Sequence, residues 1–407
     1  MTGTTATGRR SQDDIIAQAE RWSARNYEPL PVVISRAQGV WAWDSDGRRY
    51  LDCLSGYSSL NQGHRHPRII EALIDQAGRV TLTSRAFHND RMGPFLEKLC
   101  RISDMDMALP MNTGAEAVET AFKAVRRWGY ATKGVPDGEA EIIVCNRNFH
   151  GRTLAAVSAS SEAAYRKEFG PFTPGFVWVP FGDLEALEAA ITPNTVAFVV
   201  EPIQGEGGVL VPPEGYLSAA KRLCRENAVL FVLDEIQTGL GRTGRLFCHQ
   251  HEAEAKPDVL IVGKALGGGV YPVSAALSNK DILGLIQPGE HGSTFGGNPL
   301  AAAVGEAALD VILDEKLAER AERLGARFFE QLRGINSAKI KDVRGKGLFV
   351  GIELHREAGP AFAYCQQLME RGILCKDTHK QVIRLAPPLV IEEDTLDWLA
   401  EELRAVL

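Results

Sequence analysis

The chain has 407 residues, of which 45% are hydrophobic and 24% are charged, and its formal net charge at pH 7 is −7. This composition is that of a globular protein, and the length is sufficient for a large core and two domains. An acidic chain offers no basic stripe to neutralise a phosphate backbone, so we do not expect nucleic acid as a partner.

Seven cysteines are scattered along the chain, and no two stand in Cys-X-X-Cys spacing. This pattern argues against a disulfide framework and against structural zinc, and we expect no metal site. No apolar stretch approaches the twenty residues that a bilayer requires, and the N-terminus lacks the apolar segment of a secretory signal. We therefore expect a cytoplasmic protein without a membrane segment.

The first elements expected along the chain are a helix and a small β meander. Apolar residues recur at helical spacing over residues 13–24. Residues 26–34 and 39–53 are strand-like, and the second run turns at Asp46-Gly47, which is typical of a hairpin.

A turn-rich segment with two histidines follows the meander. His64 and His66 could bind a metal, but no cysteine or carboxylate cluster accompanies them. Structural roles are therefore the favoured interpretation for both.

The next junction runs from an apolar strand through Asn112-Thr113-Gly114 into an alanine-rich helix. A turn of small residues leaves amide N–H groups free at the helix start, where a phosphate can bind. The same turn could also be an ordinary helix cap formed by Thr113. Both interpretations stay open on this segment alone.

A further strand, residues 141–145, leads to a loop that contains Phe149, His150 and Arg152. A guanidinium in such a loop can bind a carboxylate through two parallel hydrogen bonds. An isolated arginine is more often a surface residue, so the loop alone does not decide between the two.

Three later apolar runs, typical of strands buried on both faces, are each followed by a charged side chain. They lead to Glu206, which stands between glycines, to Asp234 and to Lys264. Open α/β sheets bind ligands at the carboxyl ends of their strands, so Asp234 and Lys264 could share one crevice. The alternative is a lysine that is simply solvated. Nucleotide binding is excluded here, because the GxxxxGK[ST] pattern is not met.

Strands and helices alternate over residues 105–280, which predicts an α/β domain with a mostly parallel sheet and helices on both faces. Short strands return near the C-terminus and predict a smaller α+β domain. We expect residues 1–55 to form the N-terminal part of the small domain, residues 56–300 the large domain, and residues 301–407 the C-terminal small domain.

An aldehyde cofactor held by a lysine needs four kinds of group, and the sequence can supply all four. Lys264 would hold the aldehyde and then move a proton between carbon atoms. Asp234 would keep a pyridine nitrogen protonated, because an opposite charge nearby favours the charged form. Gly114 and Ala115 would offer N–H groups to a phosphate, and Phe149 would cover the ring.

The order of these motifs resembles the class III aminotransferases, which depend on pyridoxal 5′-phosphate. The resemblance runs from about residue 27 to residue 391 and rests on NTGAEAVETA, NFHGRT, EPIQGEGGV, LDEIQTGLGRTG, GKALGGGVYPVSA, GSTFGGNPLA and RLAPPLVI. It implies the fold type I architecture, pyridoxal phosphate as cofactor, and a homodimer whose active sites lie at the subunit interface. One departure is His150, where relatives can carry another aromatic residue, and we expect it to alter packing near Arg152.

The resemblance also implies further cofactor contacts. Thr113 begins the turn that holds the phosphate, and Thr294 would reach the phosphate held by the other subunit. Gln237 would contact the phenolic oxygen side of the cofactor. Ile236 would lie on the ring face opposite Phe149.

Within the family, the chain resembles members that act on ornithine. These carry one tyrosine in a segment like NYEPLPV and another in a segment like GYSSLNQGH, and Tyr27 and Tyr57 match both. The resemblance implies that Tyr27 and Arg152 receive the α-amino and α-carboxylate groups of ornithine. Glu206 would neutralise Arg384 while ornithine binds. When 2-oxoglutarate enters, Glu206 would leave, so that Arg384 takes its α-carboxylate and Arg152 the distal one.

Other interpretations stay open. An acetylornithine or succinylornithine aminotransferase shares the cofactor residues, but its acylated substrate does not need Tyr27 together with Tyr57. A 4-aminobutyrate aminotransferase is a weaker alternative. A pyridoxal-phosphate-dependent decarboxylase or aminomutase would keep Lys264 without needing Glu206 and Arg384. A cofactor-binding protein without catalysis would not need Lys264.

Overall fold

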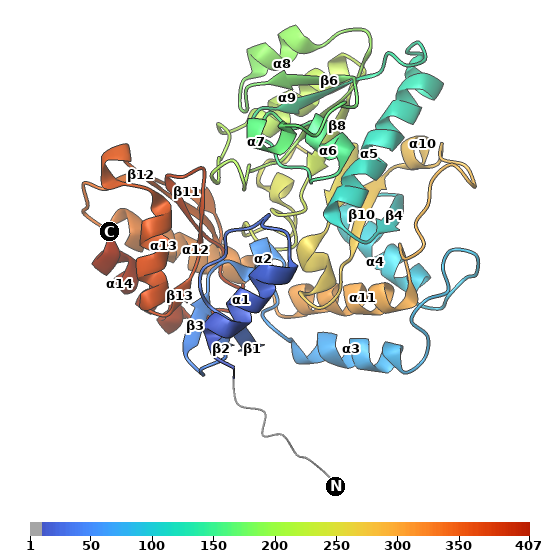
Figure 1. Cartoon of the computed structure of the whole chain (residues 1–407). Coiled ribbons are helices and arrows are strands. Elements are labelled where there is room, and N and C mark those ends of the chain that lie inside the picture. Colours follow the sequence, from blue (N-terminus) through green and yellow to red (C-terminus); the bar gives the residue numbers. More distant parts are fainter. Residues whose placement is uncertain (1–9) are drawn as a thin grey trace.

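A seven-stranded sheet from the middle of the chain is the largest layer of the structure (Figure 1). In the computed structural model, which describes residues 10–407, its strand order is β4-β10-β9-β8-β7-β5-β6. Only β10 runs antiparallel to its neighbours, so the sheet is mostly parallel, as predicted. The strands are β4 (Met107–Met111), β5 (Glu141–Cys145), β6 (Phe176–Val179), β7 (Thr195–Val200), β8 (Leu230–Asp234), β9 (Val259–Val262) and β10 (Ser274–Ser278).

Both faces of this sheet are buried, because successive side chains of a strand point to opposite faces. In β7, Ala197 and Val199 enter one core, whereas Phe198 and Val200 enter another. The first core is shared with α5 (Gly114–Trp128), which lies along β4 and β10 in Figure 1. The second includes side chains from α4 (Met92–Ser103), α8 (Leu184–Ala190), α9 (Tyr216–Glu226) and α11 (Pro299–Asp314).

Two smaller sheets of four strands contain the remaining strands. The first combines both ends of the chain, because β13 pairs in parallel with β3. It consists of β1 (Ile34–Gln38), β2 (Trp41–Asp44), β3 (Arg49–Asp52) and β13 (Ile373–Leu374). The second consists of β11 (Ile340–Lys346), β12 (Phe349–Leu354), β15 (Val382–Leu385) and β14 (Lys376–Thr378).

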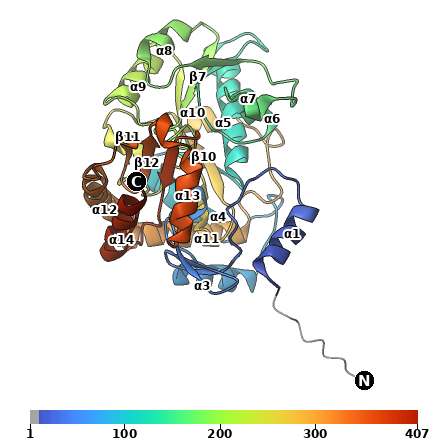
Figure 2. The same cartoon turned by 60° about the vertical axis from the view of Figure 1, so that its left-hand side comes forward.

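Three helices pack beside these two sheets and come forward in Figure 2. They are α12 (Leu317–Arg333), α13 (Ala361–Glu370) and α14 (Glu393–Val406). The other helices are α1 (Gln12–Trp22), α2 (Ser55–Ser58), α3 (Pro67–Ala77), α6 (Leu154–Ser158), α7 (Ala163–Arg166) and α10 (Lys280–Leu283). Within residues 10–407, no helix has both the length and the apolar character that a bilayer span requires.

The N-terminal strands differ in part from the prediction. The hairpin at Asp46-Gly47 is present as β2 and β3, but of the strand-like run 26–34 only Ile34 lies in a strand. Pro29 and Pro31 explain the difference, because a proline has no N–H group to donate to a neighbouring strand.

The two histidines of the turn-rich segment each pair with one carboxylate. His64 Nε2 lies 2.8 Å from Asp52, and His66 Nε2 lies 2.9 Å from Glu315. Across the part of the chain that is described, no three His, Cys, Asp or Glu side chains gather as a metal site would require.

Candidate active site

Lys264 and Asp234 line the same cavity, which has a volume of about 180 Å³. Asp234 is the last residue of β8, and Lys264 follows the end of β9. The two strands are parallel neighbours, with Asp234 in register with Ile261, so the residues that follow them arrive at one edge of the sheet. The structure thus brings the predicted amine and carboxylate together.

The backbone and the charge of Lys264 are both unusual. Its φ is +47°, a left-handed conformation that is uncommon for residues other than glycine and that clusters at functional sites. Burial lowers the pKa of its amine from 10.5 to about 8; the Glu206 carboxylate opposes this change and the Arg384 guanidinium adds to it. An amine that loses its proton this close to neutrality can serve as a base.

Asp234 is oriented by two neighbours. His150 Nδ1 lies 2.7 Å from Oδ2, and the amide of Ile236 donates to Oδ1 at 3.1 Å. Both side chains are buried, and His150 Nε2 has no partner among the described residues. The imidazole of His150 thus pairs with Asp234, and its effect on packing near Arg152 stays a prediction.

The turn before α5 is both a helix cap and a wall of the cavity. Thr113 Oγ1 accepts a hydrogen bond from the Glu116 amide at 3.3 Å, and the Glu116 carboxylate accepts one from the Thr113 amide at 2.6 Å. Gly114 and Ala115 line the cavity at the positive end of the helix. A Cβ atom on Gly114 would lie 3.0 Å from Ile236 Cδ1, so glycine lets the turn approach Ile236 closely.

These groups fit a pyridine aldehyde with a phosphate arm. The start of α5 suits the phosphate, Asp234 suits a protonated ring nitrogen, and Lys264 suits the aldehyde. Phe149 and Ile236 add apolar wall to the same cavity.

Glu206 and Arg384 form an ion pair in which Arg384 is buried and Glu206 is partly exposed, with Arg384 Nη1 at 2.5 Å from Glu206 Oε1. Burial alone would raise the pKa of Glu206, but Arg384 and Lys264 outweigh it, so this pKa lies below its ordinary value. Gln237 Nε2 also donates to Glu206 Oε1, at 3.4 Å, and Thr378 Oγ1 donates to the Glu206 carbonyl at 2.6 Å. The pair is therefore held by both its side chains and its backbone.

The two predicted tyrosines lie on one side of this pair. The Tyr57 ring is 4.9 Å from the guanidinium carbon of Arg384. Tyr27 is 75% exposed and lies outside the Lys264 cavity, although it lines a neighbouring hollow of about 400 Å³ together with Tyr57. Tyr57 thus connects Tyr27 with the ion pair.

Arg152 is held by aromatic rings. Its guanidinium carbon lies 3.5 Å from the centre of the Tyr165 ring and 5.4 Å from that of Phe149. The two rings meet edge to face, with centres 6.1 Å apart. The structure therefore brings Arg152 next to the cavity wall that Phe149 forms, and the sequence analysis did not single out Tyr165.

The two remaining predicted cofactor residues have different positions. Gln237 lines the cavity and also donates to the carbonyl of Tyr57 at 3.3 Å. Thr294 is exposed and does not line the cavity of its own chain, whereas its neighbour Ser293 accepts a hydrogen bond from Asn112 at 3.0 Å. The structure therefore does not bring Thr294 to the other cofactor residues.

Glu201 is a cavity residue that the sequence analysis passed over. It is buried, it lines the cavity, and its carboxyl group accepts a hydrogen bond from the Phe149 amide at 3.0 Å. Burial, and then the charge of Asp234, raise the pKa of Glu201 well above its ordinary value. Glu201 directly follows β7, just as Asp234 ends β8, so the rule that pointed to Asp234, a carboxylate at the end of an apolar strand, also indicates Glu201.

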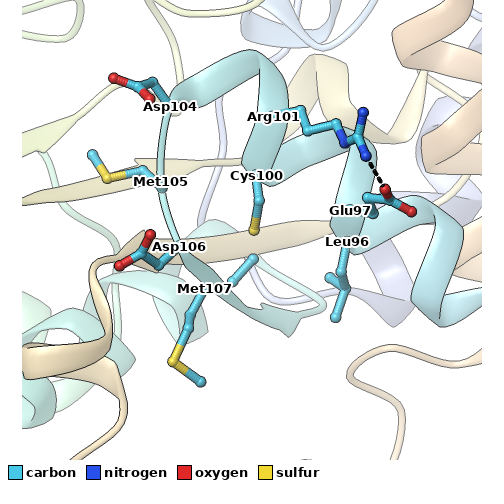
Figure 3. A pocket seen from close by; sticks show the side chains of 9 residues that line it. Leu96, Glu97, Cys100, Arg101, Asp104, Met105, Asp106 and Met107 are labelled. Carbon is cyan, nitrogen blue, oxygen red and sulfur yellow. Dashed lines mark hydrogen bonds and ion pairs between the residues drawn. The ribbon is translucent and has the colours of Figure 1, made fainter.

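A larger hollow, of about 650 Å³, lies between α4 and the start of β4 (Figure 3). Arg101 and Glu97 pair with each other on its rim. None of the nine lining residues is a lysine, so this hollow offers no amine of the kind that Lys264 brings to the smaller cavity.

The family model for class III aminotransferases ("Aminotransferase class-III") matches residues 22–407. This chain belongs to the class III aminotransferases. These are pyridoxal-phosphate-dependent enzymes, so the predicted family, fold class, enzyme class and cofactor are confirmed. How the individual residues of this class III aminotransferase act stays a prediction.

Named relatives show how similar this class III enzyme is to others. It is 59% identical to an ornithine aminotransferase of Geobacillus sp. (strain WCH70). That alignment of 393 residues covers 97% of this chain and 98% of the relative. An ornithine aminotransferase structure from Toxoplasma gondii, with partial occupancy of pyridoxal phosphate at its active site, has a TM-score of 0.96 and 47% identity over 98% of this chain and 94% of that one. An acetylornithine aminotransferase structure from Elizabethkingia anophelis has a TM-score of 0.88 and 46% identity over 98% and 99%.

Proposed function

We propose that this enzyme transfers the δ-amino group of L-ornithine to 2-oxoglutarate, with pyridoxal phosphate bound through Lys264. The products are glutamate and glutamate 5-semialdehyde, which cyclises to pyrroline-5-carboxylate. The observation that carries the proposal is the ion pair between Glu206 and the buried Arg384 near Lys264. The 59% identity to an ornithine aminotransferase supports the same substrate.

The ion pair explains how one cavity can serve two different substrates. While Glu206 neutralises Arg384, a substrate carboxylate gains little there, so ornithine does not enter with its α end toward this pair. When 2-oxoglutarate enters, Glu206 turns away and Arg384 receives the α-carboxylate. Gly205 and Gly207 flank Glu206, and glycine is required at the first of these positions, because a Cβ atom on Gly205 would lie 1.6 Å from Gln237 Oε1.

The far end of each substrate meets Arg152 in this proposal. Arg152 takes the α-carboxylate of ornithine and the distal carboxylate of 2-oxoglutarate, because its exposed guanidinium is held against Tyr165 and Phe149. Tyr27 takes the α-amino group of ornithine, and Tyr57 bounds the site beside Arg384.

When bound, pyridoxal phosphate supplies an electron sink for the carbon that carries the amino group. Lys264, with a pKa of about 8, takes a proton from the substrate carbon that carries the amino group and delivers it to a carbon atom of the cofactor. Asp234, held in place by His150 Nδ1, would face the ring nitrogen of the cofactor. Burial, and then the charge of Asp234, raise the pKa of Glu201, which favours its uncharged form beside Asp234.

We also propose a homodimer with shared active sites. Asn89 donates to the Gly297 carbonyl at 3.4 Å, which places the segment around residue 89 beside the loop of Thr294. Large apolar side chains are exposed on both segments, among them Phe87 and Phe295, and such exposure marks interaction surfaces. A second subunit would cover them and receive Thr294 at its phosphate.

The domain division and the compartment are further parts of the proposal. Residues 1–55 and 301–407 would form the small domain, supported by the pairing of β3 with β13, and residues 56–300 the large one. All seven cysteines are free thiols, and six of them are buried, which fits a reducing compartment such as the cytoplasm.

A second candidate is an acetylornithine aminotransferase. The Elizabethkingia anophelis structure of that name is 46% identical, and the exposure of Tyr27 leaves room for an acylated amine at this end of the site. The two candidates share every cofactor residue, so substrate turnover separates them.

The test is to incubate the purified enzyme with 2-oxoglutarate and with ornithine, acetylornithine or 4-aminobutyrate in turn. We expect ornithine to give the highest kcat/KM and trapped pyrroline-5-carboxylate to match the glutamate formed. A higher kcat/KM for acetylornithine would overturn the substrate assignment. Lys264→Ala should bind the cofactor without the visible absorption band of the lysine-linked form, and an unchanged band would overturn the assignment of Lys264.

A further inference from the structure

A separate cavity, of about 410 Å³, lies against the loop that follows Glu206. Its charged lining consists of four cationic side chains and two carboxylates, besides two histidines, which makes a net charge of +2 with the histidines neutral. These charged residues are Arg147, Lys341, Arg344, Arg356, Glu353 and Glu357. The proposed function uses none of them.

The positive charges of this cavity are only partly neutralised. Glu353 accepts hydrogen bonds from Lys341 at 2.6 Å and from Arg344 at 2.5 Å, and Asp342 accepts another from Arg344 at 3.0 Å, so Lys341 and Arg344 are both paired with carboxylates. Arg147 and Arg356 form no ion pair with any residue between 10 and 407. Guanidinium groups match the geometry of oxyanions, so two unpaired ones on the same cavity are suited to bind an anion together.

The same cations hold the backbone of the Glu206 loop. Arg147 Nη2 donates to the Gly207 carbonyl at 2.6 Å, and Arg344 Nη2 donates to the Gly208 carbonyl at 2.7 Å. The backbone is strained beside these contacts: Arg147 has φ +64°, and Val209, whose carbonyl accepts a hydrogen bond from Arg344 Nε at 3.1 Å, has φ +52°. A β-branched residue in the left-handed region is a rare conformation, and such strain clusters at ligand clamps and switches.

We propose that this cavity binds a phosphate-type oxyanion and that the bound anion stiffens the Glu206 loop. Arg147 uses one N–H group on Gly207, and the rest of its five donors remain free for the anion. An anion shared with Arg356 fixes the otherwise exposed Arg147 side chain and thereby holds Gly207 in place. Glu206 then leaves Arg384 less readily.

The kinetic consequence rests on the proposed function. Only the half-reaction with 2-oxoglutarate requires Glu206 to leave Arg384. The anion therefore raises the KM for 2-oxoglutarate several-fold and leaves the KM for ornithine unchanged.

The site itself is tested by titrating the cofactor-loaded enzyme with inorganic phosphate in a calorimeter at constant ionic strength. Arg356→Gln should weaken phosphate binding about tenfold, the loss expected from one charge-assisted contact. Arg356 is exposed and its side chain makes no hydrogen bond to a described residue, so this variant keeps its fold. The matched control is Arg101→Gln, which removes a guanidinium paired with Glu97 on α4. Equal affinities in wild type and Arg356→Gln would overturn the site.

The coupling is tested by measuring both half-reactions with and without phosphate. We expect the phosphate-dependent rise in the KM for 2-oxoglutarate to disappear in Arg356→Gln and to persist in Arg101→Gln. A rise of equal size in Arg356→Gln would mean competition at Arg152 or Arg384 and would overturn the coupling. If the wild type does not use ornithine, the proposed function fails, whereas the phosphate titration still decides on the site.

Discussion

Glu206 has two charged neighbours whose properties depend on it. It pairs with Arg384, and it raises the pKa of Lys264 against the opposing effect of burial. Under the proposed function, one carboxylate therefore influences which substrate end is accepted and at which pH the Lys264 amine loses its proton.

Glu206→Ala should shift substrate preference toward α-amino substrates. Arg384 would then be free to bind the α-carboxylate of glutamate in both directions of the reaction. A charge-assisted hydrogen bond contributes about 1.5–3 kcal/mol, and Arg384 would make such a bond to the α-carboxylate of glutamate. The kcat/KM for glutamate as amino donor should therefore rise at least tenfold relative to that for ornithine. The half-reactions are measured by cofactor absorbance, with Glu97→Ala as a surface control. An unchanged ratio would count against the switch.

The reactivity of Lys264 should depend on pH with a midpoint near its lowered pKa of about 8. Below this pH the amine is protonated and cannot attack an aldehyde; above it, the free amine dominates, so the rate at which cofactor-free enzyme takes up pyridoxal phosphate rises and then levels off. In Glu206→Ala the midpoint should move lower, because the lost carboxylate favoured the charged amine. A midpoint near 10.5, the ordinary lysine value, would show a solvated side chain.

At the scale of elements, the sheet and its strand ends could be predicted because their signals are local. Apolar runs predict strands buried on both faces, and the residue after each run then lies at the ligand-binding edge. Asp234 and Lys264 were accessible to this reasoning, and Glu201 satisfies the same rule. Pro29 and Pro31 should equally have limited the first strand-like run.

The contacts between loops could not be predicted, because they depend on side-chain direction. Nothing in the spacing of Phe149, His150 and Arg152 indicates that the imidazole points to Asp234 while the guanidinium points to Tyr165. Tyr165 belongs to the short helix α7, 13 positions beyond Arg152, and no periodic pattern connects them. The solvent exposure of Tyr27 likewise follows from tertiary packing.

The packing of α7 against the Arg152 loop leads to a third prediction. Tyr165→Leu removes the ring that lies 3.5 Å from the Arg152 guanidinium carbon. Cation–π contacts contribute about 0.5–2 kcal/mol, so the KM for both ornithine and 2-oxoglutarate should rise roughly two- to thirtyfold with little change in kcat. Tyr165→Phe keeps the ring and should restore both values. KM values in Tyr165→Leu equal to those of the wild type would show that Tyr165 does not position Arg152.

For the whole molecule, the position of Thr294 decides whether one chain can form a complete site. Thr294 is exposed and lies outside the cavity of its own chain. Phe295 on the same loop is also exposed, and so is Phe87 on the segment that contacts this loop through Asn89. A phosphate contact from Thr294 therefore requires a second subunit, and this requirement can be tested by combining two defective chains.

Thr294→Ala alone should lower cofactor affinity, and Lys264→Ala alone should abolish transamination. Co-expressed, they form hybrid dimers in which one site combines an intact Lys264 with the partner's Thr294. Because about half of the dimers are hybrids and each has one intact site, the mixture should regain roughly a quarter of wild-type activity at limiting cofactor. Lys264→Ala mixed with Asp234→Ala is the control, since both of those residues act within one chain and no hybrid site is complete. If Thr294 served the cofactor of its own chain, the first mixture would be no more active than its Thr294→Ala chains are by themselves.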